Sequence, residues 1–117
     1  MKLTLTLCAA LLAFSGTAFA QNAGPTSPEV HPDRRVTFRI AAPKATDVTF
    51  KGDWHDDTKK MTKGADGVWS LTVDAMAPST YIYAFTVDGV TIADPVNPRI
   101  KLRERTSASL VVVPAAA

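Results

Sequence analysis

Residues 66–98 read DGVWSLTVDAMAPSTYIYAFTVDGVTIADPVNP, and this stretch decides the fold. Apolar side chains recur at every second position in two runs, first Trp69, Leu71 and Val73, and then Tyr81, Tyr83, Phe85 and Val87. A period of two is typical of a strand that packs on one face. A bend at residues 77–79 separates the runs, and Asp88-Gly89 is a strong signal for a two-residue hairpin. The stretch therefore predicts a β-meander with Phe85 at the centre of its packed face.

Further alternating segments lie on both sides of this meander. Val36, Phe38 and Ile40 alternate with polar residues, and residues 46–51 do the same around Val48 and Phe50. Residues 107–113 end in a continuous apolar run, which indicates a central or well-covered strand. No segment has a sustained helical period. Six or seven short strands over about eighty residues, separated by turn signals, predict one all-β sandwich of immunoglobulin-like type.

The first 20 residues have the features of a secretory signal peptide. Lys2 precedes an apolar run over residues 3–14 that is too short to span a membrane, and Ala18-Phe19-Ala20 has the form of a signal-peptidase site. We expect cleavage before Gln21, export to the periplasm or the outside of a bacterial cell, and no membrane attachment afterwards. Residues 21–32 are rich in Pro, Ser and Thr and predict a flexible leader. The sandwich is expected over residues 33–114.

The composition limits the possible partners. Of 13 basic and 11 acidic residues, only Lys2 lies in the predicted signal peptide, so the exported chain is nearly neutral. This balance gives no indication of nucleic acid or an anionic membrane as a partner. The single cysteine, Cys8, also precedes the cleavage site, which leaves neither a disulfide nor a thiolate metal site. We expect no cofactor and a stability that depends on core packing.

The sequence contains no motif for catalysis. A G-x-S-x-G elbow is absent, and His31 and His55 are the only histidines. No pair of carboxylates lies on a scaffold suited to glycoside hydrolysis. A triad assembled in space is left open, because triads are defined by geometry rather than by sequence order. We therefore predict no catalytic residue and expect that the chain is not an enzyme by itself.

Trp54 lies among polar residues in the longest irregular stretch, residues 52–67. Together with Asp53, His55 and Asp57 it forms a candidate carbohydrate-binding site. Sugars stack their apolar C–H faces on aromatic rings, while their hydroxyl groups need polar neighbours. The alternative is that Trp54 folds over the edge of a sheet and belongs to the core.

The acidic residues around Trp54 also raise the possibility of a cation site. The segment DWHDD at residues 53–57 offers three carboxylates and an imidazole. It lacks the spacing of a calcium loop, however, and nearby lysines neutralise its charge. We therefore predict a solvated polar loop and no metal site.

Basic residues alternate in sequence before the last predicted strand, at Arg99, Lys101, Arg103 and Arg105. In an extended segment these side chains share one face. Such a stripe is typical of an edge strand that is protected against edge-to-edge pairing. The alternative is a docking stripe for an acidic partner.

Four motifs together resemble carbohydrate-binding module family 48, the early-set immunoglobulin-like domain of glycogen-processing enzymes. They are G-x-W at residues 52–54, G-V-W at 67–69, Y-x-Y-x-F-x-V-D-G at 81–89 and D-P-x-N-P at 94–98. More narrowly, the chain looks like the domain that precedes the catalytic domain of secreted bacterial esterases of the feruloyl-esterase kind. The resemblance covers about residues 27–113. It implies an early-set sandwich associated with glycoside hydrolases or esterases.

The sequence departs from the glycogen-binding members of this family. Those members carry tryptophans near Asp57 and Thr91, a lysine near Ala84 and an asparagine near Ser109, and this chain keeps none of them. The resemblance therefore implies a non-catalytic carbohydrate-associated module with a weak contact to an oligosaccharide or polysaccharide. The alternative is a structural docking domain for a separate esterase domain. We expect the chain to be either a truncated esterase or a free-standing module.

Overall fold

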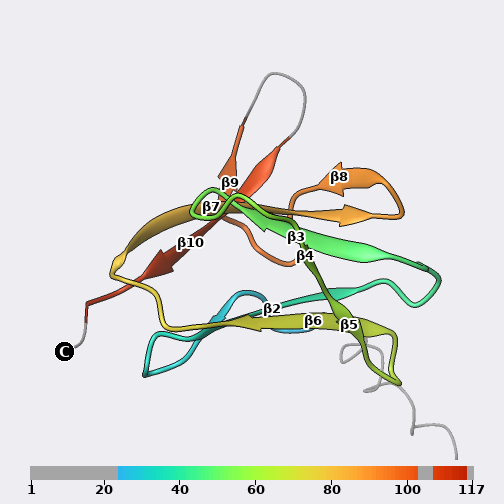
Figure 1. The fold of residues 1–117 in the computed structure, drawn as a ribbon, viewed down its shortest axis with the longest axis horizontal. Coiled ribbons are helices and arrows are strands. Elements are labelled where there is room, and N and C mark those ends of the chain that lie inside the picture. Colours follow the sequence, from blue (N-terminus) through green and yellow to red (C-terminus); the bar gives the residue numbers. More distant parts are fainter. Residues whose placement is uncertain (1–23, 103–106, 116–117) are drawn as a thin grey trace, which may run out of the picture.

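The computed structural model describes residues 24–102 and 107–115, so the predicted signal peptide lies outside the described residues. Within these ranges the chain forms strands and no helix, and the strands lie in two layers (Figure 1). They are β1 (Glu29–Val30), β2 (Val36–Ala41), β3 (Val48–Gly52), β4 (Lys59–Lys60), β5 (Thr62–Lys63), β6 (Val68–Val73), β7 (Ser79–Val87), β8 (Val90–Ile92), β9 (Ile100–Lys101) and β10 (Ala108–Val113).

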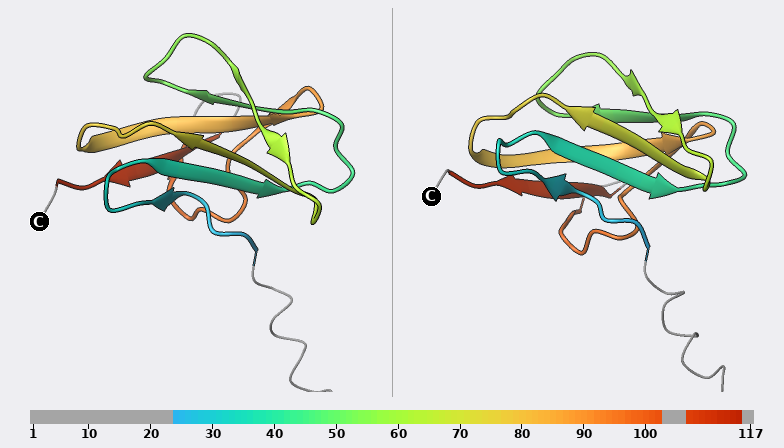
Figure 2. Two further views of the ribbon diagram at one scale, coloured as in Figure 1. Left: turned by 60° about the horizontal axis from the view of Figure 1, so that its bottom comes forward. Right: turned by 90° about the horizontal axis from the view of Figure 1, so that it is seen from below.

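Two antiparallel sheets make up these layers. The first has the strand order β1-β2-β6-β5, and the second has the order β4-β3-β7-β10-β9 with β8 also paired to β7. Figure 2 shows the two layers stacked face to face. The predicted all-β sandwich of early-set immunoglobulin-like type is confirmed. The strands outnumber the six or seven expected, because several are only two residues long and leave little pattern in the sequence.

The strands predicted within residues 66–98 are observed as β6, β7 and β8, but the prediction that they form one meander is wrong. Only β7 and β8 pair as a hairpin, while β6 belongs to the first sheet, because the bend at residues 77–79 carries the chain from one sheet to the other. Val87 pairs with Val90 across the tight turn, and Asp88 and Gly89 have φ angles of 46° and 88°. Both residues therefore adopt the left-handed conformation that this hairpin turn requires. In β7, Tyr83 and Phe85 are buried. The alternation in the sequence thus predicted the buried face of the strand correctly.

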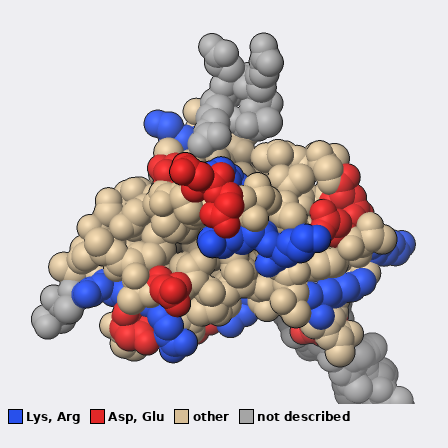
Figure 3. Space-filling model, viewed as in Figure 1, with Lys and Arg blue, Asp and Glu red and all other residues tan. Residues whose placement is uncertain are grey.

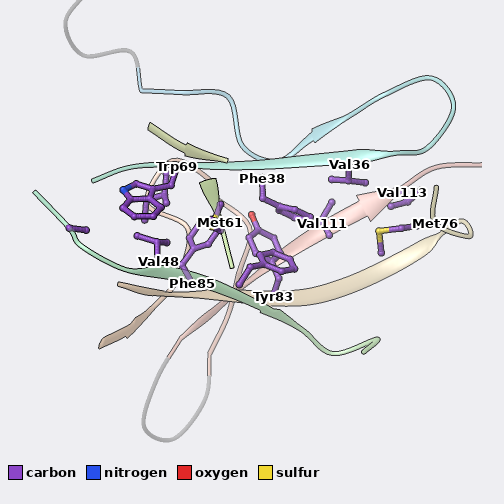
Figure 4. Close-up of a cluster of buried hydrophobic side chains, with 13 residues drawn as sticks. Val36, Phe38, Val48, Met61, Trp69, Met76, Tyr83, Phe85, Val111 and Val113 are labelled. Carbon is purple, nitrogen blue, oxygen red and sulfur yellow. The ribbon is translucent and has the colours of Figure 1, made fainter. Parts of the chain in front are cut away.

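Aromatic side chains from both sheets form the centre of the core (Figure 4). Phe38 of β2 lies 4.4 Å from Phe50 of β3 and 4.6 Å from Tyr83 of β7, measured between ring centroids. Phe85 lies 5.8 Å from Tyr83. These rings are fully buried or nearly so. Since apolar burial is the main favourable term in folding, this cluster is the main source of the domain's stability.

The stretch 52–67 is less irregular than predicted, because it crosses from one sheet to the other. β4 pairs with β3 in the second sheet, and β5 pairs with β6 in the first. Met61 lies between the two short strands and is only 6% exposed. Its side chain points into the core between the layers (Figure 4). A single apolar residue at the crossing was too weak a signal to predict these strands.

The predicted flexible leader over residues 21–32 is wrong for its second half. Glu29 and Val30 form β1 and pair with Thr37 and Val36 of β2. Ser27 is buried, and its hydroxyl accepts a hydrogen bond from the backbone N–H of Arg39. Side-chain and backbone bonds of this kind leave little trace in composition. Residues 21–23 lie outside the described residues.

The strand predicted over residues 107–113 is observed as β10, and it is central as expected, between β7 and β9. Its apolar run does not mean burial on both faces, since Val112 is 41% exposed. Val111 and Val113 point into the core, and Leu110 and Val112 lie on the outer face of the sheet.

A buried polar network joins the start of the domain to the D-P-x-N-P motif. The Asp94 carboxylate accepts hydrogen bonds from the hydroxyls of Ser27 at 2.6 Å and Tyr83 at 2.7 Å. The Asn97 side chain donates to the Tyr83 hydroxyl and to the carbonyl of Leu110. Asp94 is 2% exposed and Asn97 is 6% exposed. The motif therefore anchors three separate parts of the chain from inside the fold.

Burial of Asp94 makes a specific prediction about pH. Burial raises the pKa of this carboxyl above its ordinary value of 3.8, although hydrogen bonds from Ser27, Tyr83 and Val96 oppose the shift. Because the folded state holds the proton more tightly, the contribution of Asp94 is most favourable below pH 3.8 and is lost as pH rises through the folded-state pKa. We expect the free energy of unfolding, relative to that of Asp94→Asn, to fall as pH rises above 3.8.

The comparison with Asp94→Asn is needed because other carboxyls act in the opposite direction. The pKa values of Glu29, Asp33, Asp57 and Asp88 are lowered in the folded state, so their contributions are lost as pH falls. These exposed groups are common to both proteins and cancel. Urea unfolding at several pH values measures the difference. A difference that stays constant or rises with pH would contradict the prediction.

Candidate functional site

The candidate site lies in the loop between β3 and β4, which arches away from the two layers in both views of Figure 2. The loop begins at Gly52, on which the indole of Trp54 rests. A Cβ atom at residue 52 would lie 2.2 Å from Cζ3 of Trp54, which is closer than real contacts allow. The G-x-W motif therefore has a packing reason: only glycine lets the indole approach the strand so closely.

Trp54 is partly buried and closes the core at one edge of the sandwich. Its ring centroid lies 5.2 Å from that of Tyr81 and 5.8 Å from that of Phe50, both in edge-to-face geometry. The indole is thus held rigidly by aromatic neighbours, while part of it stays accessible to solvent. Trp54 packs on the core, as the alternative considered from the sequence predicts, and its accessible part lines a surface groove.

His55 braces the loop with both ring nitrogens. Nε2 accepts a hydrogen bond from the backbone N–H of Gly52 at 3.0 Å, and Nδ1 donates to the carbonyl of Asp57 at 2.7 Å. Its backbone carbonyl accepts a bond from Lys51 Nζ. The imidazole is 12% exposed. Because both nitrogens are already bonded, His55 positions the loop and has no polar atom left for a ligand.

The two aspartates of the predicted site also serve the loop. Asp53 exchanges hydrogen bonds with the backbone of Ile82, donating through its N–H and accepting through Oδ1. The Asp57 carboxylate lies 3.6 Å from both His55 Nδ1 and Lys59 Nζ. Its own backbone N–H and the charge of Lys59 lower the pKa of Asp57. The four predicted residues therefore share one loop, but only Trp54 and His55 line the groove beside it.

This groove, which we call the edge groove, has a volume of about 520 Å³. Its walls come from three parts of the chain: the Trp54 loop, the second half of β6 with the segment that follows, and the start of β7. The lining side chains are Trp54, His55, Lys59, Leu71, Thr72, Val73, Asp74, Ala75, Met76, Ala77 and Tyr81. Apolar and aromatic surface is combined with one ammonium and one carboxylate group. This composition is typical of small-ligand sites.

Most of the edge groove is not evident from the sequence. The alternation of residues places Tyr81 and Leu71 in the core stripe, but both are only partly buried at this end of the sandwich. Nothing in the local sequence around Lys59 or Asp74 predicts that they lie beside Trp54, because the strand order of the two sheets brings them there. Acidic and basic side chains lie next to each other on the face in Figure 3, in agreement with the near-neutral composition.

Two of the four positions at which the sequence departs from glycogen-binding family members lie on the outer face of the second sheet. Ala84 and Thr91 lie there and line a depression of about 380 Å³ with Lys51, Asp53 and Thr86 among others. No aromatic ring from these positions covers it. Ser109 points inward instead, since it is fully buried and accepts a hydrogen bond from the N–H of Asp94.

One group of side chains has the residue types of a catalytic triad. Nδ1 of His31 lies 3.8 Å from the Glu29 carboxylate, and Nε2 lies 2.8 Å from the hydroxyl of Thr37. Thr37 is only 5% exposed and lies inside β2 between β1 and β6. Its hydroxyl is also bonded to that of Thr72. A substrate carbonyl has no access to a hydroxyl in this position, so the group is a structural network.

The predicted basic stripe is described only in part. Arg99 and Lys101 are exposed at the sheet edge formed by β9, beside Ile100 and Leu102, which are 50% and 80% exposed. Arg103 and Arg105 lie outside the described residues. Within residues 24–102 and 107–115, no three potential metal-ligating side chains gather at one point. In the same ranges no helix is long and apolar enough to cross a membrane.

The comparison with protein families defines the class of this module. Residues 24–100 match the model of carbohydrate-binding module 48, described as the isoamylase N-terminal domain. The chain therefore belongs to the carbohydrate-binding module 48 family. No curated protein sequence matches the chain.

Solved structures share this fold at low sequence identity. The enterobactin esterase Fes of Shigella flexneri matches with a TM-score of 0.65 and 18% identity, over 86% of this chain and 35% of that one. The pullulanase of Bacillus acidopullulyticus matches with a TM-score of 0.57 and 24% identity, over 75% and 12%. The pneumococcal glycogen-degrading virulence factor SpuA matches with a TM-score of 0.59 and 18% identity, over 77% and 16%. The chain thus corresponds to a small part of each larger enzyme.

Proposed function

We propose that this chain is a non-catalytic accessory module that makes a weak glycan contact in the edge groove. The observation that carries the proposal is the position of Trp54, which is held rigidly beside Tyr81 at the wall of a groove of about 520 Å³. An aromatic surface that is already ordered costs little entropy when a sugar stacks on it. The family to which the chain belongs supports a carbohydrate context.

The affinity expected from this geometry is low. A stacking aromatic contributes about 1 kcal/mol beyond the area it buries, and each rim hydrogen bond adds a similar amount. The loss of translational and rotational freedom offsets several kcal/mol of this gain. We therefore expect a dissociation constant in the millimolar range, which corresponds to a binding free energy near −4 kcal/mol.

Titration with malto-oligosaccharides and xylo-oligosaccharides tests this function. We expect the amide resonances of the edge groove to shift with a millimolar midpoint for one of these series, a readout that Trp54→Phe also retains. Trp54→Phe keeps an aromatic ring against Tyr81 but presents less area, so it should weaken binding about threefold to tenfold. Val90→Ala, on an exposed residue outside the groove, is the matched control. No change with either series at tens of millimolar would contradict the proposal.

We propose in addition that the module accompanies an esterase and is exported. The resemblance to the N-terminal domain of feruloyl-esterase-type enzymes supports this context. An esterase reading frame beside the one for this chain would strengthen it.

Export predicts a product that begins at Gln21, which intact-mass analysis of the exported protein checks. A product that keeps Met1, or that carries lipid on Cys8, would contradict it.

Docking on a separate esterase domain is the second candidate function. The observation that favours it is that the exposed large apolar residues of the described chain fall in one part of the sequence. All of them fall between residues 90 and 112: Val90, Val96, Ile100, Leu102 and Val112. Exposed apolar surface of this kind is common at protein contacts. If no glycan shifts the amide resonances of the edge groove, the docking function takes the place of sugar binding.

A further inference from the structure

The edge groove contains an unpaired stretch of sheet edge. β6 runs from Val68 to Val73, but β5 pairs only with Trp69 and Ser70. The chain before β5 crosses to the other sheet at Met61, so it leaves the second half of β6 uncovered. Over residues 71–73 the described chain gives β6 a strand partner on one side only, in β2. Such an edge presents free backbone donors and acceptors.

The direction of these backbone groups follows from the pairing pattern. In an antiparallel sheet, successive residues direct their N–H and C=O groups to opposite sides of the strand. The N–H of Gly64 donates to the carbonyl of Val68, so the backbone groups of Val68 face β5. Alternation places those of Ser70 and Thr72 on the same side. Because β5 stops opposite Ser70, the N–H and C=O of Thr72 point to the open edge.

An independent observation supports this assignment. Thr72 is opposite Thr37 of β2, and their hydroxyls are 2.8 Å apart. Side chains come closest in the antiparallel pairs that do not exchange backbone hydrogen bonds. The short contact between the two hydroxyls therefore indicates that Thr72 and Thr37 do not exchange backbone hydrogen bonds. The backbone groups of Thr72 therefore point away from β2, toward the edge groove that Thr72 lines.

The groups around Thr72 complement a sugar ring. Trp54, Tyr81, Leu71 and Met76 supply apolar surface for the C–H groups of the ring. The N–H and C=O of one extended residue lie side by side, so they can donate to one hydroxyl and accept from the next. Asp74 is exposed at the same groove and accepts from a further hydroxyl. His55 takes no part, because both ring nitrogens are bonded within the loop.

We propose that the open backbone edge of Thr72, together with the Asp74 carboxylate, recognises adjacent hydroxyl groups of a neutral pyranose. The ligand class is a short oligosaccharide with a free vicinal diol, bound at the end of the sandwich and not on the outer face of the second sheet. This inference rests on the proposed glycan contact at Trp54. It adds the residues that select the sugar and the hydroxyl pattern that they select.

The test uses the full chain and three variants at the edge. Thr72→Pro removes the N–H that faces the groove, Thr72→Val removes only the side-chain hydroxyl, and Asp74→Asn removes the charge. Maltotriose and xylotriose are the probes, and methyl glycosides of the same sugars with hydroxyls 2 and 3 methylated are the matched ligand controls. Asp56→Asn, on an exposed residue that does not line the groove, is the matched protein control.

We expect the sugar that changes the Trp54 indole resonance to shift the Thr72 amide resonance as well. Thr72→Pro and Asp74→Asn should each weaken binding about fivefold to tenfold, whereas Thr72→Val and Asp56→Asn should change it less than about twofold. The methylated glycosides should fail to bind. Asp74→Asn leaves the strand backbone unchanged, so it decides the matter if Thr72→Pro does not fold.

Three results would overturn the inference. In the first, a sugar shifts the Trp54 resonance but binds to Asp74→Asn and Thr72→Pro as tightly as to the native chain. The proposed function would then stand, and the inference about Thr72 and Asp74 would fail. Equal losses in Thr72→Val and Thr72→Pro would assign recognition to the side chain. If no sugar shifts the Trp54 resonance, the inference and the proposed function both fail. A shift of the Thr72 amide resonance by a blocked Val-Thr-Val peptide would then identify the edge as a site for an added strand.

Discussion

Replacing Phe85 with alanine is expected to lower the free energy of unfolding by about 3–5 kcal/mol, a large part of what a small domain possesses. Phe85 is fully buried, and its ring lies 5.8 Å from that of Tyr83 and 6.1 Å from that of Phe50. Truncation removes these contacts and leaves a cavity between the sheets that the rigid strands fill only in part. Urea denaturation of the two proteins measures the loss.

Thr86→Ala is the matched control for this prediction. Thr86 is the next residue in β7, so its side chain points to the outer face, where its hydroxyl lies 3.1 Å from that of Thr91. Its replacement should cost less than about 1 kcal/mol. Losses of similar size at the two positions would contradict the register of β7, because a shift by one residue exchanges the faces of a strand.

Asp94→Ala is expected to destabilise the domain by a similar amount, about 3–5 kcal/mol, although it removes no apolar contact of the core. The carboxylate is the acceptor for the buried hydroxyls of Ser27 and Tyr83, and its loss leaves both donors without that partner. Each buried donor that loses its partner costs about 1–3 kcal/mol. Chemical denaturation at neutral pH gives the difference.

Two further comparisons separate the loss of the hydrogen-bond network from the loss of a carboxylate as such. Asp56→Ala removes an exposed carboxylate and should cost less than about 0.5 kcal/mol. In the background of Tyr83→Phe, which already lacks one of the two donors, Asp94→Ala should cost less than it does in the native chain. Equal costs in both backgrounds would show that the hydroxyl of Tyr83 and the carboxylate of Asp94 are not coupled, against the geometry.

The fold could be predicted from the sequence because its main strands are half-buried and carry the signal in their alternation. Phe38, Phe50, Tyr83 and Phe85 each lie on the side of the strand that the pattern predicts. Asp88-Gly89 indicated the hairpin, because few other residue pairs accept two positive φ angles. The two-residue strands β1, β4 and β5 escaped prediction, since two residues are too few to show a period, whereas β9 falls within the basic stripe that was interpreted as an edge strand.

The candidate site could be predicted only as far as Trp54. Its polar surroundings in the sequence indicated a functional loop, but the bonds made by Asp53, His55 and Asp57 serve the loop itself. The edge groove depends on which strand lies at a sheet edge and where its neighbour stops. These properties arise from strand order, and local sequence does not encode them. The Asp94 network was hidden for the same reason, because Ser27 and Asp94 are 67 positions apart.

The most direct measurement for the glycan contact is a map of amide chemical-shift changes in the full chain on titration with maltotriose and xylotriose. We predict that the changes are concentrated around the edge groove, at Trp54, Leu71 and Tyr81, with a millimolar midpoint. We predict none on the outer face of the second sheet. Changes centred on Ala84, Thr86 and Thr91 instead, or no changes with either sugar, would contradict a glycan contact in the edge groove.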